Sequence, residues 1–219
     1  IENNLVYDAG ASCLSTDCPA NTCMPDDGSP ISRDNLNGLK IASDYCIVRN
    51  NLFAGNGDQT LSEYDNQTYS DCTYNRMFFN TCYGNYLGMR ISTDSLTTHP
   101  MNYNIFKNNI FASNIMKNFT AGTALVETGN LTENNIVYDG AFTYKTAGTL
   151  AAAESSFPNE VKNNLTSDPL FTNETLRDFT LQSGSPAIDA GAWLTTITSA
   201  TGSGTSFVVA DAKYFMDGW

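Results

Sequence analysis

Four basic residues have side chains suited to removing a proton from a carbon next to a carboxylate. They are Arg49, Arg76, Arg90 and Lys107. Such a reaction uses a basic side chain to take the proton and a cation to neutralise the carboxylate. Arg49 and Lys107 occupy the same position of a repeat two copies apart, so we expect them on one face, and Arg90 shares another position with Lys40. Such residues also form the solvated side of an alternating strand, which is the interpretation that we prefer.

Histidine and metal chemistry have less support in the sequence. The single histidine, His99, lies in a Thr-Thr-His-Pro segment and is more typical of a surface loop than of a catalytic base. Two acidic clusters, Asp26-Asp27-Gly28 and Asp58 with Glu63 and Asp65, lack the spacing of a calcium loop. We therefore predict no catalytic residue and no metal site, and Ca²⁺ is only a secondary cofactor candidate. Loop tyrosines are candidates for stacking on sugar rings: Tyr64, Tyr69, Tyr74 and Tyr86.

The cysteines indicate an oxidising compartment. The chain has 219 residues and six cysteines, and their number favours disulfides over free thiols. The sequence has neither a Cys-x-x-Cys pair nor a Cys/His cluster, so we do not expect a zinc site. The disulfide candidates are Cys13, Cys18, Cys23, Cys46, Cys72 and Cys82. Their pairing stays open, because the sequence does not determine it.

Asn-x-Ser/Thr sequons raise the question of N-glycosylation. The candidates for carrying a glycan are Asn66, Asn118, Asn130 and Asn173. A further sequon begins at Asn164, but we expect this residue to face inward because it belongs to a series of regularly repeated Asn residues.

An internal repeat organises the elements that must position these side chains. Each copy has β-favouring apolar residues, an Asn, a short apolar pair and a polar or small break, as in Ile47-Val-Arg-Asn-Asn-Leu-Phe-Ala-Gly-Asn56. One Asn per copy recurs at intervals of 29, 29, 26 and 29 residues, after a first copy 47 residues earlier. The aligned residues are Asn4, Asn51, Asn80, Asn109, Asn135 and Asn164. We predict that their side-chain amides hydrogen-bond to one another in an inward ladder.

Copies of this length are too short to bury their apolar residues alone, so neighbouring copies must stack. The segments alternate with a period of two and are rich in Ile, Val, Phe and Tyr, which predicts short strands. The expected fold class is all-β, a parallel β-solenoid of about six coils with side-loop insertions. We place the β-helix at residues 1–191, with a cysteine-rich loop insertion at about 11–36. Residues 192–219 form a C-terminal β segment, either the start of a further small region or an assembly strand.

The segment from Asp168 to Gly191 carries a family resemblance. It reads Asp-Pro-Leu-Phe, then Asp-Phe-Thr-Leu, then Ser-Pro-Ala-Ile-Asp-Ala-Gly. This resembles the closing segment of secreted microbial right-handed parallel β-helix repeat proteins of the pectin-lyase-like superfamily. The resemblance implies a right-handed β-helix and an extracellular or cell-surface location. The superfamily contains many polysaccharide lyases and hydrolases, but the Gly-His-Gly and Arg-Ile-Lys motifs of polygalacturonase-like members are absent from this sequence.

The net charge and the repeats at the two ends of the chain indicate which partners the protein can bind. A net charge of −12 argues against nucleic acid, and no apolar run approaches the ~20 residues of a membrane span, so we expect no membrane insertion. The chain begins inside a repeat and shows no obvious caps, so we expect strand edges at both ends that pair with other copies or other extracellular proteins.

The favoured function is a non-catalytic structural or surface protein, such as a filament or sheath subunit assembled through the β-helix ends. A polysaccharide lyase or hydrolase and a carbohydrate-binding adhesin are the alternatives, because this scaffold hosts all three functions.

Overall fold

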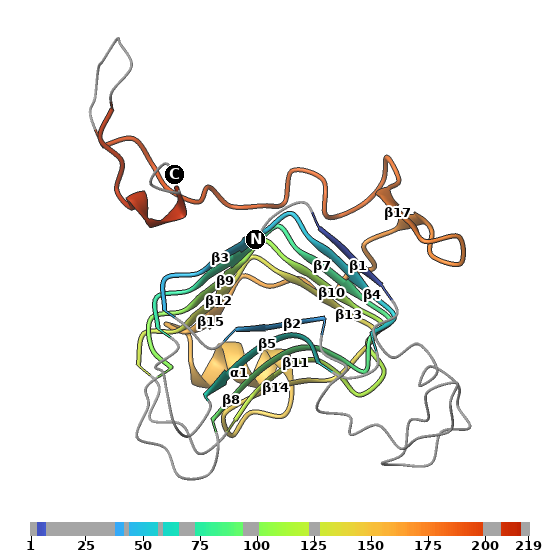
Figure 1. Ribbon diagram of the computed structural model, residues 1–219, viewed down its shortest axis with the longest axis horizontal. Helices are drawn as coiled ribbons and strands as arrows, with labels where there is room; N and C mark the ends of the chain where they lie inside the picture. The colour runs from blue at the N-terminus through green and yellow to red at the C-terminus, as the bar shows by residue number, and fades with distance from the viewer. Residues whose placement is uncertain are drawn as a thin grey trace.

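Three parallel five-stranded sheets form most of the part of the chain that the computed structural model describes (Figure 1). The first sheet has the order β1 (Leu5–Tyr7), β4 (Leu52–Ala54), β7 (Thr81–Tyr83), β10 (Ile110–Ala112) and β13 (Ile136–Tyr138). The second contains β2 (Leu39–Ile41), β5 (Gln59–Asp65), β8 (Leu87–Thr93), β11 (Lys117–Ala121) and β14 (Phe142–Tyr144). The third contains β3 (Ile47–Arg49), β6 (Arg76–Phe78), β9 (Ile105–Lys107), β12 (Leu131–Glu133) and β15 (Val161–Lys162). The described residues are 4–7, 38–41, 44–56, 59–65, 73–93, 101–122, 128–198 and 207–215.

Successive strands along the chain belong to different sheets, and every third strand returns to the same sheet beside its predecessor. All strand pairs within these three sheets are parallel, and Figure 1 shows the strands of each sheet lying behind one another. The prediction of an all-β fold with stacked parallel strands is therefore confirmed, and the arrangement fits a β-solenoid.

The core consists of inward side chains that stack from strand to strand. In the first sheet, Phe53 is paired with Cys82, and Cys82 with Phe111. In the second, the rings of Phe119 and Phe142 stack with centroids 5.1 Å apart. Each inward residue is covered by its equivalents in the neighbouring strands, which is how strands of three residues bury apolar surface that none could bury alone.

The predicted Asn ladder runs along the corner between the third and first sheets. The Nδ2 group of each Asn donates to the Oδ1 atom of the next one, over 2.9–3.1 Å, from Asn4 through to Asn164. The backbone N–H groups of the same residues donate to the same oxygens. The stacking of buried Asn is thus confirmed, and it satisfies amides that would otherwise be costly to bury.

Two further ladders were not predicted. At the corner that follows the first sheet, the amides of four Asn residues are bonded in series: Asn56, Asn85, Asn114 and Asn118. At the corner before the third sheet, backbone N–H groups donate to the Oδ1 atoms in the series Asn75, Asn104 and Asn130. Residues within each series are 29 or 26 positions apart, except for the last step from Asn114 to Asn118, which lies within one repeat. The periodic Asn residues are therefore a sequence signal for these two ladders as well.

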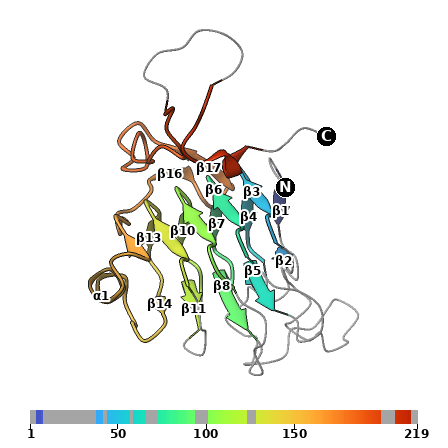
Figure 2. The same cartoon turned by 90° about the vertical axis from the view of Figure 1, so that its left-hand side faces the viewer.

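A short helix covers one end of the stack. Helix α1 (Leu150–Ser156) begins at its N-cap Thr149, whose side chain accepts from the Ala152 N–H, and it buries Leu150 and Ala153 against the core. It contacts β14 and β15, and Figure 2 shows it at the end opposite the N-terminus. The expectation of uncapped strand edges at both ends was therefore wrong at this end, because the Ala-rich segment folds over the last coil.

The C-terminal residues form an arm that returns across the outside of the sheets (Figure 1). The arm begins with an antiparallel hairpin of β16 (Phe171–Asn173) and β17 (Asp178–Leu181) and ends in the 3-10 helix η3 (Ala212–Tyr214). The last parallel strand, β15, ends at Lys162, and an isolated parallel bridge joins Leu165 to Ile136. Residues 168–191, which the sequence predicts to belong to the β-helix, follow these contacts as the first part of the arm. In this structure Val209 pairs with Ile197 of the same chain, so this C-terminal β segment is engaged within the molecule.

Candidate functional site

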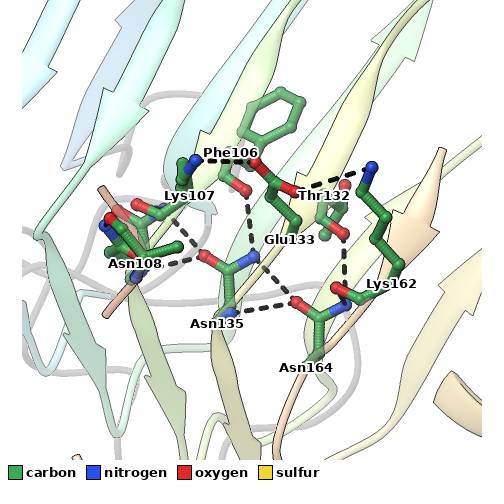
Figure 3. Close-up of polar contacts among 10 residues, drawn as sticks. Phe106, Lys107, Asn108, Thr132, Glu133, Asn135, Lys162 and Asn164 are labelled. Atoms are coloured by element: carbon green, nitrogen blue, oxygen red, sulfur yellow. Dashed lines mark hydrogen bonds and ion pairs between the residues drawn. The ribbon is translucent and has the colours of Figure 1, made fainter. Parts of the chain in front are cut away.

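The outer face of the third sheet carries the predicted row of basic residues. Strand register places Arg49, Phe78 and Lys107 in line, so the expectation that the two basic residues share a face holds in the structure. Lys107 is only 7% exposed, and its Nζ atom lies 2.8 Å from Glu133 Oε1 (Figure 3). Lys162 Nζ lies 3.7 Å from the other oxygen of Glu133. This geometry binds Lys107 into an ion pair within the sheet rather than presenting it as a base.

Arg76 is buried beneath the C-terminal arm. It is 4% exposed, and its guanidinium donates to the Tyr103 carbonyl at 2.9 Å, lies 3.7 Å from Asp211, and sits over the Tyr214 ring at 5.6 Å. Burial raises the pKa of Tyr214 to about 12, although the positive charge of Arg76 opposes this shift. Arg76 therefore attaches the arm to the sheets.

A stack of tyrosine rings stands at the corner before the third sheet. The ring centroids of Tyr45 and Tyr74 are 5.1 Å apart, and those of Tyr74 and Tyr103 are 4.9 Å apart. Lys213 of the arm lies 4.5 Å from the Tyr74 ring centroid. The faces of Tyr74, one of the predicted sugar-stacking residues, are therefore occupied by protein groups. Tyr86 is half-buried, Tyr64 lies in β5, and Tyr69 lies outside the described residues.

The structure describes two of the six cysteines that were predicted to form disulfides, Cys46 and Cys82. No disulfide joins the two described cysteines, and Cys82 is a fully buried thiol in the core, so its assignment to a disulfide was wrong. Cys46 is half-buried. The remaining positions lie outside the described residues: Cys13, Cys18, Cys23, Cys72 and Asn66.

Two of the four glycosylation candidates are buried. Asn118 is 0% exposed and donates to the Tyr138 carbonyl at 2.8 Å, and Asn130 is 2% exposed and donates to the Met101 carbonyl at 2.7 Å. A glycan on either amide would displace a ladder residue, so neither Asn118 nor Asn130 has room for a glycan in this fold. Asn173 is exposed in β16 and stays a prediction.

The remaining chemical candidates are not assembled in the described part of the chain. His99, Asp26, Asp27 and Asp58 lie outside it, and Glu63 and Asp65 belong to β5. Among the described residues, no group of three or more His, Cys, Asp or Glu side chains is placed to hold a metal ion. None of the helices described there has the length and apolar character needed to cross a bilayer.

A groove of 610 Å³ lies between the corner of the first ladder and the arm. Its floor is formed by residues at four successive corner levels: Phe79 to Thr81, Asn108 to Ile110, Asn134 with Ile136, and Asn163 with Leu165. Its opposite wall comes from the arm, from Leu181 and from residues 187 and 189–193. Because each coil places an equivalent corner above the last, the groove follows the stacking direction for about 14 Å, three strand spacings of about 4.8 Å.

The groove floor repeats one backbone conformation. The residue before each ladder Asn has a positive φ, of 57° at Phe79 and Asn108, 53° at Asn134 and 56° at Asn163. Asn tolerates this left-handed conformation better than most residues, which explains the recurring Asn-Asn pairs of the sequence. The sequence analysis assigns a role only to the second Asn of each pair, and the Asn-Asn pair is the sequence signal for this row.

The arm is fastened to this row at one level. Asn108 Nδ2 donates to the Ala192 carbonyl at 2.8 Å, and the Ala192 N–H donates to Asn108 Oδ1 at 2.9 Å. The next residue, Trp193, lines the groove with 86% of its surface exposed. At the two following levels, the amides of Asn134 and Asn163 line the groove without a side-chain hydrogen bond to any described residue.

Comparison of the chain with protein-family models, with curated proteins and with solved structures found no match.

Proposed function

We propose that this chain is a non-catalytic structural or surface protein that works outside the cell. Its scaffold is a right-handed parallel β-helix of about six coils, related to the pectin-lyase-like superfamily. The Asp168 to Gly191 segment and the Asn-centred repeat support this relationship, and the stacked sheets with three Asn ladders are compatible with it. The acidic net charge of −12 and the cysteine-rich segment suit an extracellular setting.

The observation that carries the non-catalytic assignment is the state of Lys107 and Arg76. A base for proton abstraction must reach its substrate within hydrogen-bond distance. Lys107 is paired at 2.8 Å with Glu133, and Arg76 is held under the arm by Asp211 and Tyr214. Both side chains are therefore engaged in structural contacts and are not positioned to act as a base on a substrate.

The test is incubation of the full chain with uronate-containing polysaccharides, with and without Ca²⁺, followed by ultraviolet absorbance of unsaturated products and by reducing-end analysis. We expect no turnover. Sustained product formation that disappears in Lys107→Ala or Arg49→Ala would assign the chain to the lyases and overturn the proposal.

Assembly through the β-helix ends has one structural constraint. Helix α1 contacts β14 and β15, the end strands of two of the three sheets, so another copy can add strands to these two sheets only after α1 is displaced. We expect Leu150→Asp, which expels α1 from the core, to increase self-association in analytical ultracentrifugation, and Ala151→Asp on the exposed side of α1 to leave it unchanged. Equal behaviour of the two variants would remove α1 as the element that limits assembly.

A further inference from the structure

We infer that the groove between the corner row and the C-terminal arm binds a neutral oligosaccharide. This inference deepens the proposed function and rests on it in one respect, since a non-catalytic surface protein holds a glycan without cleaving it. The corner row is defined here as Phe79, Asn108, Asn134 and Asn163.

The size and length of the groove suit an extended small ligand. Its 610 Å³ falls within the range of about 300–1,000 Å³ of ligand pockets. It crosses four corner levels, and equivalent groups on its floor recur at about 4.8 Å. A chain of similar ring units, rather than a single compact molecule, matches a floor that repeats along its length.

The charge of the lining selects for a neutral ligand. Among the described residues that line the groove, Asp189 alone carries a charge, and neither Lys nor Arg is present. Phosphate, sulfate and uronate groups are bound by cationic partners, so an anionic ligand would meet only repulsion from Asp189. The ligand class is therefore uncharged.

The corner amides supply the hydrogen bonds that hydroxyl groups need. A side-chain amide both donates and accepts, and so does a hydroxyl. Asn108 shows the capacity of this position, because its amide binds both the N–H and the C=O of Ala192. Asn134 and Asn163 repeat the same backbone conformation at the next two levels, and their side-chain amides have no hydrogen bond to any described residue. Two consecutive positions of the row are thus available to a ligand.

Aromatic rings complete the lining. Trp193 is 86% exposed beside the level of Asn108, and Phe79 is 46% exposed at the preceding level. An indole offers an apolar face and a polar N–H, so it suits a ring that has C–H groups on its faces and hydroxyls on its rim. The floor thus combines apolar surface with the side-chain amides of Asn108, Asn134 and Asn163, while the amides of Asn80 and Asn109 are engaged in the ladder.

The experiment uses the full chain with Trp219→Phe, because the protein has two Trp residues and this change leaves Trp193 as the sole indole. Cellohexaose, mannohexaose and hexagalacturonate are titrated while Trp193 fluorescence is followed, and isothermal titration calorimetry is used for variants that lack Trp193. We expect saturable binding of at least one neutral hexasaccharide and none of hexagalacturonate. Trp193→Ala should weaken the affinity by about 10-fold or more.

Asn134→Gly and Asn163→Gly test the amides, since Gly accepts a positive φ without strain. Each should weaken binding by roughly 3- to 10-fold, the effect of one or two lost hydrogen bonds. Asn50→Gly is the matched control, because Asn50 has the same conformation, with φ 54°, one coil beyond the groove. Its affinity should equal that of the parent.

Three outcomes would overturn the site. The first is that neither neutral hexasaccharide binds, and the second is that Asn50→Gly and Asn134→Gly lose equal binding affinity. The third is a fluorescence change that depends on protein concentration alone. The last would assign the groove to a second copy of the chain. Cleavage of a bound hexasaccharide would instead support the site and overturn the non-catalytic function, so the two failures are distinguishable.

Discussion

Glu154 of helix α1 ends the first Asn ladder. Its Oε1 atom accepts from the Asn164 backbone N–H at 2.9 Å and from Asn164 Nδ2 at 3.2 Å. In each preceding coil, the same two donors of the ladder Asn are bound by the Oδ1 atom of the next Asn. Glu154 thus replaces the missing next coil, so one residue joins the end of the ladder to the helix that covers the core.

This relationship predicts a loss of stability in Glu154→Ala. The substitution leaves the backbone N–H of Asn164 without its acceptor, whereas Asn164 Nδ2 keeps the Thr132 and Lys162 carbonyls. We expect the free energy of unfolding to fall by about 1–3 kcal/mol. Glu154→Gln keeps an acceptor oxygen and should lose less than half as much, because only the charge assistance is removed. Urea denaturation measures both variants. Equal losses in the two would show that the ladder end does not depend on this acceptor.

A ladder residue in the middle of the stack should contribute more to the free energy of unfolding than Glu154 at the end of the ladder. Asn109 donates Nδ2 to the Met77 carbonyl and to Asn135 Oδ1, and its own Oδ1 accepts from Asn80. Asn109→Ala leaves several buried groups unpaired, so we expect a loss of about 3–5 kcal/mol.

Asn50→Gly is the control for this ladder prediction. Asn50 lies at the same corner with an exposed side chain, and its replacement should change stability by under about 0.5 kcal/mol. A loss in Asn109→Ala no larger than that in the control would contradict the role of the ladder in stability.

Cys82 should be unreactive in the folded protein. Its thiol is fully buried between Phe53 and Phe111, and burial raises its pKa well above the ordinary range. Because the thiolate is the reacting species, alkylation by iodoacetamide should be very slow in native buffer and rapid in concentrated urea. Peptide mapping by mass spectrometry after timed labelling gives both rates. Fast labelling of Cys82 under native conditions would show that this coil opens.

The attachment of the arm should weaken at high pH. Burial raises the pKa of Tyr214 from 10.0 to about 12, so the folded state holds the phenolic proton more tightly than the detached arm does. The stabilisation is therefore fully present below pH 10 and is lost as the pH rises towards 12. Limited proteolysis of the arm across this window should show increasing cleavage between residues 192 and 215.

Tyr214→Phe is the matched variant for the arm. It keeps the ring over Arg76 and removes the ionisable hydroxyl, so its cleavage should change much less across the same pH window. The same pH dependence in parent and variant would assign the effect to another group.

The fold class was predictable because the repeat encodes it locally. Strand segments such as Ile105–Lys107 alternate with a period of two, and Asn residues recur at 29 or 26 residues. Those two regularities suffice to predict stacked parallel strands and the first ladder. The ladders through Asn85 and Asn104 have the same period, so a single aligned Asn per copy predicts only one of the three ladders.

The sequence by itself thus determined which residues repeat. Stacking similar short units leaves few ways to bury their apolar side chains. Only the tertiary structure decided what the chain does with its irregular parts. It placed Glu154 under Asn164, Arg76 beneath Tyr214, and Ala192 on Asn108 across 84 residues. The physical reason is that ladder contacts are fixed by a period within the sequence, whereas the helix, the arm and the groove depend on contacts between segments that share no period.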